Sequence, residues 1–165
     1  LHARAVHGCE RVAVIDFDVH HGNGTQAAFE TDPSCLYIST HQWPLYPGTG
    51  RASEHGLGNI YNRCLPPGAG STAFRSAVSD AVIPAIEQFR PDFIFISAGF
   101  DAHIRDPLAN LCLTEEDYGW VTAELMQVAD RHCGGRVVSA LEGGYDLEAL
   151  AASARAHVKA LMLAA

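Results

Sequence analysis

Four short apolar runs, rich in β-branched residues, alternate with longer segments of helical periodicity, and this alternation restricts the fold more than any other feature. The runs cover residues 11–17, 35–40, 93–97 and 136–141. Continuous apolar runs of this length are typical of strands buried on both faces, as in a parallel sheet flanked by helices. The sequence therefore predicts an α/β fold, a three-layer α/β/α arrangement with a mainly parallel sheet. No linker or repeat interrupts the 165 residues, so we expect residues 1–165 to form a single domain.

The helical segments between the runs carry recognisable ends. Residues 71–89 place apolar side chains at helical spacing, and Pro84 is expected to kink this helix or split it in two. Thr114 followed by Asp117 resembles a capping box, and Asp146 is a good N-cap for a last helix. The chain opens on LHARAVHG, without Met, which is typical of the end of a helix. We therefore expect a C-terminal portion of a longer domain.

Charge and cysteine content exclude several classes of protein. The net charge of −8 disfavours a nucleic-acid partner, because phosphate contacts need a basic surface. The five cysteines are scattered, with no C-x-x-C spacing, which favours reduced thiols and a cytoplasmic location. No apolar run is long enough to span a membrane, and no signal peptide is visible.

Polar residues follow three of the predicted strands at the point where each strand ends. Asp18 and His20 follow the first, Asp101 the third and Tyr145 the fourth. Ligand sites in open parallel sheets form at the carboxyl ends of strands, so these groups should converge. Two carboxylates and one imidazole suit a catalytic metal site with an open position, for Zn²⁺, Fe²⁺ or Mn²⁺. Alternatively, Asp18 and His20 only cap the next helix and Asp101 is a turn residue.

A family resemblance bears on this choice. The sequence contains, in order, VAVIDFDVHHGNGTQ, YISTHQWPLYPGTG, FISAGFDAHIRDPLANLCLT and LEGGYDLEAL. These stretches closely resemble successive motifs of the histone deacetylase and acetylpolyamine amidohydrolase family. They are most similar to class II and bacterial members, in which Asn follows HHG. The resemblance covers nearly the whole chain, so it implies a deacetylase-like fold of which the N-terminal part is missing here.

The resemblance implies a role for each matching residue. Asp18, His20 and Asp101 would bind a catalytic zinc ion, and Tyr145 would donate a hydrogen bond to the scissile carbonyl oxygen. Gly143 and Gly144 would give the tyrosine loop its backbone freedom. The alternative for Tyr145 is a buried aromatic residue at a strand end.

Further matches concern the surroundings of the metal. Asp16 and Asn23 would orient a catalytic histidine pair, unless Asp16 is a core carboxylate satisfied by backbone N–H groups. Tyr46 and Leu108 would line the substrate channel, although both could be ordinary loop residues. A K⁺ or Na⁺ site would involve Asp16, Asp18, His20, Ser39 and Thr40. No role is assigned to His21, His41, His55 or His103.

The implied activity is zinc-dependent hydrolysis of acetyl-lysine or of an acetylated polyamine. The family's catalytic histidine pair belongs to an upstream GHH motif that this sequence lacks, so we expect the chain alone to have negligible activity. One rival is a ureohydrolase with two Mn²⁺ ions, but Gly22 and His103 occupy the places of its bridging carboxylates. The other rival is a non-catalytic binding module. The sequence does not indicate the oligomeric state.

Overall fold

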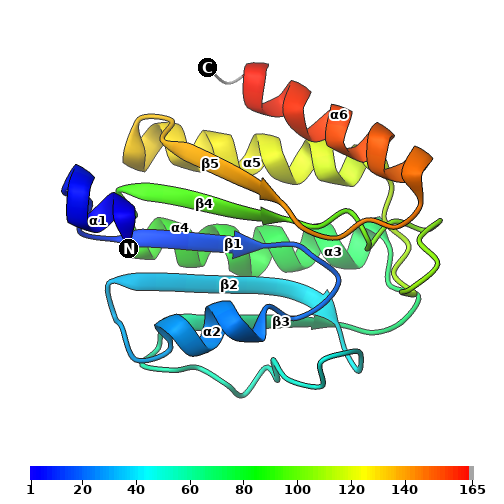
Figure 1. The fold of residues 1–165 in the computed structure, drawn as a ribbon, viewed down its shortest axis with the longest axis horizontal. Helices are drawn as coiled ribbons and strands as arrows, with labels where there is room; N and C mark the ends of the chain where they lie inside the picture. Colours follow the sequence, from blue (N-terminus) through cyan, green and yellow to red (C-terminus); the bar gives the residue numbers. More distant parts are fainter. Residues whose placement is uncertain (164–165) are drawn as a thin grey trace.

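The computed structural model describes residues 1–163, which form three layers with a sheet in the middle (Figure 1). The sheet has five strands in the order β3-β2-β1-β4-β5, and every neighbouring pair is parallel. The strands are β1 (Val12–Asp16), β2 (Cys35–Gln42), β3 (Ile60–Leu65), β4 (Phe93–Ala98) and β5 (Val137–Leu141). The predicted α/β/α architecture is confirmed.

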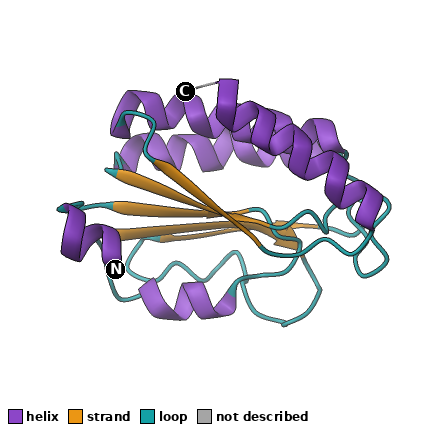
Figure 2. Ribbon diagram, turned by 45° about the horizontal axis from the view of Figure 1, so that its top comes forward, coloured by secondary structure: helices purple, strands orange, loops and turns teal. Residues whose placement is uncertain are grey.

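Helices cover the two faces of the sheet unequally (Figure 2). One face carries α3 (Ser71–Ala77), the π-helical turn η1 (Val78–Val82), α4 (Ile83–Phe89), α5 (Glu115–Cys133) and α6 (Leu147–Leu163). The other face carries the short α2 (Asn23–Phe29), while α1 (His2–His7) packs through Ala3 beside Val12 and Phe93. Most of the core therefore lies between the sheet and the longer helices.

The core beneath the sheet consists of large side chains that are almost fully buried. Ile15, Ile94 and Ile96 of the central strands pack with Ile86 of α4 and Leu125 of α5. Burial of one such side chain contributes about 1.5–3 kcal/mol to folding. The two strands that lead into the candidate site, β1 and β4, thus rest on a well-packed layer.

Helix ends behave as the sequence predicts. The carboxylate of Asp117 accepts a hydrogen bond from the N–H of Thr114 at 3.0 Å, and Asp146 Oδ1 accepts one from Ala149 N–H at 2.7 Å. The segment 71–89 is interrupted by η1, directly before Pro84 in the first turn of α4. Proline has no N–H to donate and crowds the carbonyl four residues back, and the wider π-helical turn accommodates both effects.

Two features differ from the expectation. No strand was predicted at the position of β3, which pairs with β2 at the edge of the sheet. The prediction that this strand is buried on both faces is wrong for β5, in which Val138 is 48 % exposed and Leu141 is 64 % exposed. The reason is that β5 is the other edge strand, and among residues 1–163 only its helix-facing side is covered. The apolar run alone could not reveal this position.

All five cysteines are free thiols. Within residues 1–163, no helix combines the length and the apolar character that a bilayer crossing requires.

Candidate active site

The candidate site forms where β1 and β4 end side by side. These strands pair directly, with Asp16 opposite Ser97, so the loops that follow them leave the sheet together. Two hydrogen bonds tie the loops to each other and to the end of β5. Val19 N–H donates to Asp101 Oδ1 at 2.8 Å, and Phe100 N–H donates to the carbonyl oxygen of Gly143 at 2.8 Å.

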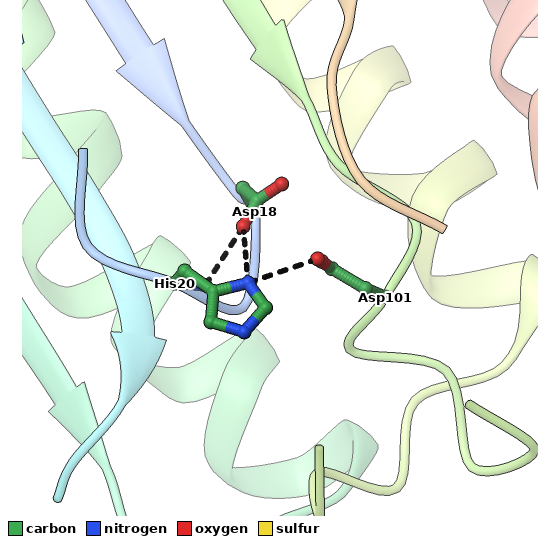
Figure 3. A group of neighbouring side chains, drawn as sticks. All are labelled: Asp18, His20 and Asp101. Carbon is green, nitrogen blue, oxygen red and sulfur yellow. Dashed lines mark hydrogen bonds and ion pairs between the residues drawn. The ribbon is translucent and has the colours of Figure 1, made fainter. Parts of the chain in front are cut away.

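Asp18, His20 and Asp101 converge at this point (Figure 3). His20 Nδ1 lies 3.1 Å from Asp18 Oδ1 and 3.1 Å from Asp101 Oδ2. One ligand atom from each of the three residues lies within 4.8 Å of the others. Two oxygens and one nitrogen this close fit a single divalent ion with an open coordination position. The predicted convergence is therefore present, and the donor set suits the metal that was expected.

Burial and opposite charge both act on these ionisable groups. Burial raises the pKa of Asp101, although the hydrogen bond with His20 opposes this shift. Burial has the same effect on Asp18, but hydrogen bonds from His20 and Gly143 outweigh it and lower the pKa of Asp18. Asp101 and then Asp18 raise the pKa of His20 to about 10. The pair of carboxylates thus stabilises one positive charge between them, as a cation-binding site must.

Gly143 permits the close approach of the third loop. Its N–H donates to Asp18 Oδ2 at 3.0 Å, and a Cβ at this position would overlap Asp101 Oδ2 and lie 2.7 Å from Asp18 Oδ2. Gly144 has a φ of 138°, a conformation that side-chain-bearing residues rarely adopt. Both glycines are therefore required by the path of the chain into Tyr145.

Asp16 is the last residue of β1, directly before the loop that carries Asp18 and His20 (the metal loop), and it is almost fully buried. Its Oδ1 accepts a hydrogen bond from Asp18 N–H at 3.1 Å, and its Oδ2 accepts one from the Tyr37 hydroxyl at 2.9 Å. Burial raises the pKa of Asp16 to about 8, against the effect of the Tyr37 hydrogen bond. Sequence reasoning missed Tyr37, because one tyrosine in an apolar strand carries no signal of a polar partner.

A cleft of about 500 Å³ opens in front of the metal-binding residues. Its walls include Tyr46, Leu108 and Tyr145, each more than half exposed, and the Tyr46 ring lies edge-to-face with His20, with 6.3 Å between centroids. The three residues come from loops far apart in the sequence, as the expected channel requires. Burial, and then the negative charges of Asp101, Asp18 and Asp106, raise the pKa of Tyr145, so its phenol stays protonated.

Other residues of the expected site lie elsewhere. Asn23 is exposed at the start of α2, and Ser39 and Thr40 are buried in β2; none of them lines the cleft. Ser39 Oγ lies 2.8 Å from His41 Nδ1, whereas Thr40 Oγ1 has no hydrogen-bond partner among residues 1–163. The roles of Asn23, Ser39 and Thr40 stay predictions.

The cleft also contains residues to which no role was assigned, Glu142 being one of the polar groups expected to converge at the strand ends. Ser97 and Glu142 line it at the ends of β4 and β5, and the Ser97 hydroxyl donates to Glu142 Oε1 at 3.1 Å. Their positions at strand ends could have pointed to them. His21 also borders the cleft but is buried, and its ring bonds Thr49 and Gln26. This histidine supports the loop rather than facing a ligand.

The family model for the histone deacetylase domain matches residues 1–161. The chain belongs to the histone deacetylase family. It is 46 % identical over 165 residues to histone deacetylase 14, chloroplastic, of Arabidopsis thaliana, covering 98 % of this chain and 39 % of that protein. It is 45 % identical over 145 residues to a probable deacetylase of Archaeoglobus fulgidus, covering 86 % of this chain and 40 % of that protein.

A solved structure supports the same family assignment. The crystal structure of the HDA15 HD domain superimposes with a TM-score of 0.87 at 42 % identity, covering 94 % of this chain and 45 % of that one. The chain spans about two fifths of the length of the two curated relatives. Histone deacetylase family membership thus holds for nearly the whole of this chain, which matches part of the length of each of these relatives.

Proposed function

We propose that this chain forms the metal-binding and tyrosine-bearing part of a deacetylase that hydrolyses the acetyl amide of acetyl-lysine or of an acetylated polyamine. The proposal rests on the convergence of Asp18, His20 and Asp101 at the floor of a cleft that also holds Tyr145. In the proposed enzyme Zn²⁺, or Fe²⁺ as an alternative, occupies the three-residue set. When bound, this ion supplies Lewis acidity toward the acetyl carbonyl and toward water.

Tyr145 has the properties of an oxyanion stabiliser. Its phenol is protonated, because burial and nearby carboxylates raise its pKa, and a neutral hydroxyl donates a hydrogen bond to an oxygen that becomes negative. In the proposed complex, Tyr145 donates a hydrogen bond to the acetyl carbonyl oxygen.

Tyr46 and Leu108 suit an extended, apolar stem. An aromatic wall and an aliphatic wall flank the same cleft, and neither introduces a charge. We propose that these two residues hold the methylene chain that lies below the acetylated nitrogen. The carboxylates that line the cleft, Asp16, Asp18 and Glu142, then favour an amine product that becomes cationic.

Proton transfer needs residues that this chain does not supply. Asp16 and Asn23 are proposed to orient a histidine pair contributed by the upstream part of the complete enzyme, which would deprotonate water and protonate the leaving amine. Residues 1–165 are thus one partial domain, and we propose that they are inactive alone. Ser39 and Thr40, with Asp16, Asp18 and His20, are proposed to hold K⁺ or Na⁺. A cytoplasmic location is proposed from the five free thiols.

Acetate release by the full-length protein tests this function. An acetyl-lysine peptide and an N-acetylated polyamine are incubated with the protein in parallel, with the 165-residue chain as a matched control. We expect turnover of at least one substrate by the full-length protein, abolished by a chelator and restored by Zn²⁺, and negligible turnover by the 165-residue chain. Absence of acetate from both substrates with a metal-loaded protein would contradict the proposal.

A further inference from the structure

Asp106 connects two walls of the cleft although it does not line the cleft itself. Its Oδ1 accepts a hydrogen bond from Leu108 N–H at 2.9 Å, and its Oδ2 accepts one from Tyr145 N–H at 2.9 Å. The residue is only 8 % exposed, and its own N–H donates to the carbonyl oxygen of His103 at 2.8 Å. Both carboxylate oxygens are therefore used on backbone groups of residues that face the substrate.

The loop that carries Tyr145 depends on such an anchor. Gly143 and Gly144 precede Tyr145, and two successive glycines leave the orientation of the next peptide group poorly restricted by local sterics. The Tyr145 side chain is 52 % exposed, so packing does not fix it either. The hydrogen bond from Tyr145 N–H to the carboxylate of Asp106 is a charge-assisted bond, which is stronger than a neutral one.

An ion pair lies beside this anchor. Arg105 Nη2 donates to Asp146 Oδ1 at 2.6 Å, and it also approaches Glu148. The pair joins the same two loops through the residues next to Asp106 and Tyr145. It is partly exposed to solvent, where ion pairs contribute little. The buried carboxylate of Asp106, rather than the surface pair, is thus the stronger constraint on the tyrosine loop.

We propose that Asp106 is a positioning residue that sets the place of the Tyr145 hydroxyl. This inference rests on the proposed function, because it assigns Tyr145 to the reaction. Asp106 does not touch the substrate and acts on the reaction through Tyr145. Misplacement of a reacting group by about 1 Å costs up to roughly 10²-fold in rate.

A double-mutant cycle in the full-length protein tests the proposal. Asp106→Asn keeps the size of the side chain but presents one acceptor oxygen where two are needed. We expect this change to lower kcat roughly 10- to 100-fold with bound metal unchanged. In a Tyr145→Phe background we expect it to lower kcat by less than about 3-fold, because the group that it positions is already absent. Equal losses in the two backgrounds would overturn the proposal.

Arg105→Gln is the matched control, since it removes only the surface ion pair between the same loops. We expect its kcat to remain within about 3-fold of the parent. A loss as large as that of Asp106→Asn would assign the positioning to the ion pair and overturn the role of Asp106. If Asp106→Asn does not fold, Asp106→Glu, which keeps the charge but moves it, enters the same cycle with the same expected non-additivity.

Hydrogen exchange separates this inference from the proposed function. In Asp106→Asn we expect the amide of Tyr145 to exchange at least 10-fold faster, with the amide of Val19 in the metal loop unchanged. If the parent protein is inactive on acetylated amines but this exchange pattern is found, the proposed function is wrong, whereas the role of Asp106 in holding the backbone at Tyr145 is supported. Unchanged exchange at Tyr145 would refute the anchor, whatever the activity.

Discussion

His20 Nδ1 lies 3.1 Å from Asp101 Oδ2, although 81 residues separate the two in the sequence. The other oxygen of Asp101 accepts a hydrogen bond from Val19 N–H, the residue next to His20. The carboxylate therefore both fixes the loop that carries the histidine and faces the histidine ring. These two contacts of Asp101 keep the three metal-binding residues in place through interactions between the two loops that carry them.

Metal content follows from this geometry. We expect the full-length protein to bind one divalent ion per chain, and Asp101→Asn to reduce this to below about 0.2, because a neutral amide is a weak ligand. Elemental analysis after gel filtration measures the ratio. Two ions per chain would contradict the single site and favour the ureohydrolase-like alternative, in spite of Gly22 and His103 at the places of the bridging carboxylates.

Loss of the Tyr145 hydroxyl should affect chemistry and not folding. In the full-length protein we expect Tyr145→Phe to lower kcat roughly 10²- to 10³-fold, the effect of removing one oxyanion donor. Tyr145 is 52 % exposed, so removal of its hydroxyl should leave the melting temperature within about 2 °C of the parent. Steady-state kinetics with an acetyl-lysine peptide measure the change. Near-normal turnover by the variant would refute the role of Tyr145.

The space at Gly143 gives a test that depends only on sterics. Gly143→Ala should displace the carboxylates of Asp101 and Asp18, because the added methyl overlaps both, and so weaken metal binding at least 10-fold. Gly24→Ala is the matched control: Gly24 lies in α2, and a Cβ there meets no atom within 4 Å. We expect this control to bind metal normally and to be unchanged or slightly more stable. Calorimetric titration with Zn²⁺ compares the two, and equal affinities would contradict the prediction.

His157 should contribute a loss of stability on acidification between about pH 6.5 and pH 4, opposed by Asp16, whose pKa burial raises to about 8. Burial lowers the pKa of His157 to about 4, and its ring lies between the hydroxyls of Thr122 and Ser139. Because the unfolded chain binds this proton at higher pH than the folded chain, His157 costs roughly 3 kcal/mol of stability once the pH is below 4. Denaturant unfolding of the full-length protein at pH 7, 5.5 and 4.5 measures the slope.

His157→Gln should reduce this loss of stability, while His41, whose pKa burial also lowers to about 4, contributes a share of similar size that remains. An unchanged slope in His157→Gln would show that His157 is not responsible.

Sequence reasoning succeeded where a residue pattern has one structural meaning. The apolar runs that became β1 and β2 are almost entirely buried, and the residues of β4 alternate between buried and half-buried. The capping groups Asp117 and Asp146 act at the helix ends to which they were assigned. It failed for β3, because Asn62 and Arg63 break the apolar run of this edge strand. Exposure of β5 depends on what packs against the sheet, which no local pattern records.

The site shows the same division. Asp18, His20 and Asp101 were predictable, because they follow parallel strands and the ends of such strands meet. The Tyr37 hydroxyl on Asp16 and the two backbone contacts of Asp106 were not, since they depend on side-chain directions across the sheet and between loops. Such contacts have no fixed spacing in the sequence.

Because all strands are parallel, the connections at the carboxyl ends of the strands lie at one edge of the sheet and those at the amino ends lie at the opposite edge. The residues that line the cleft lie at the carboxyl ends of strands, in the loops that follow them, or in the first turn of α2. The turns at residues 30–34, 90–92 and 134–136 instead enter strands at their amino ends. Changes in length or sequence at these distant turns reach the chemistry only through the packed core. New substrate preferences can therefore arise at one rim of the sheet while the opposite rim adapts to temperature or to a partner, each without disturbing the other.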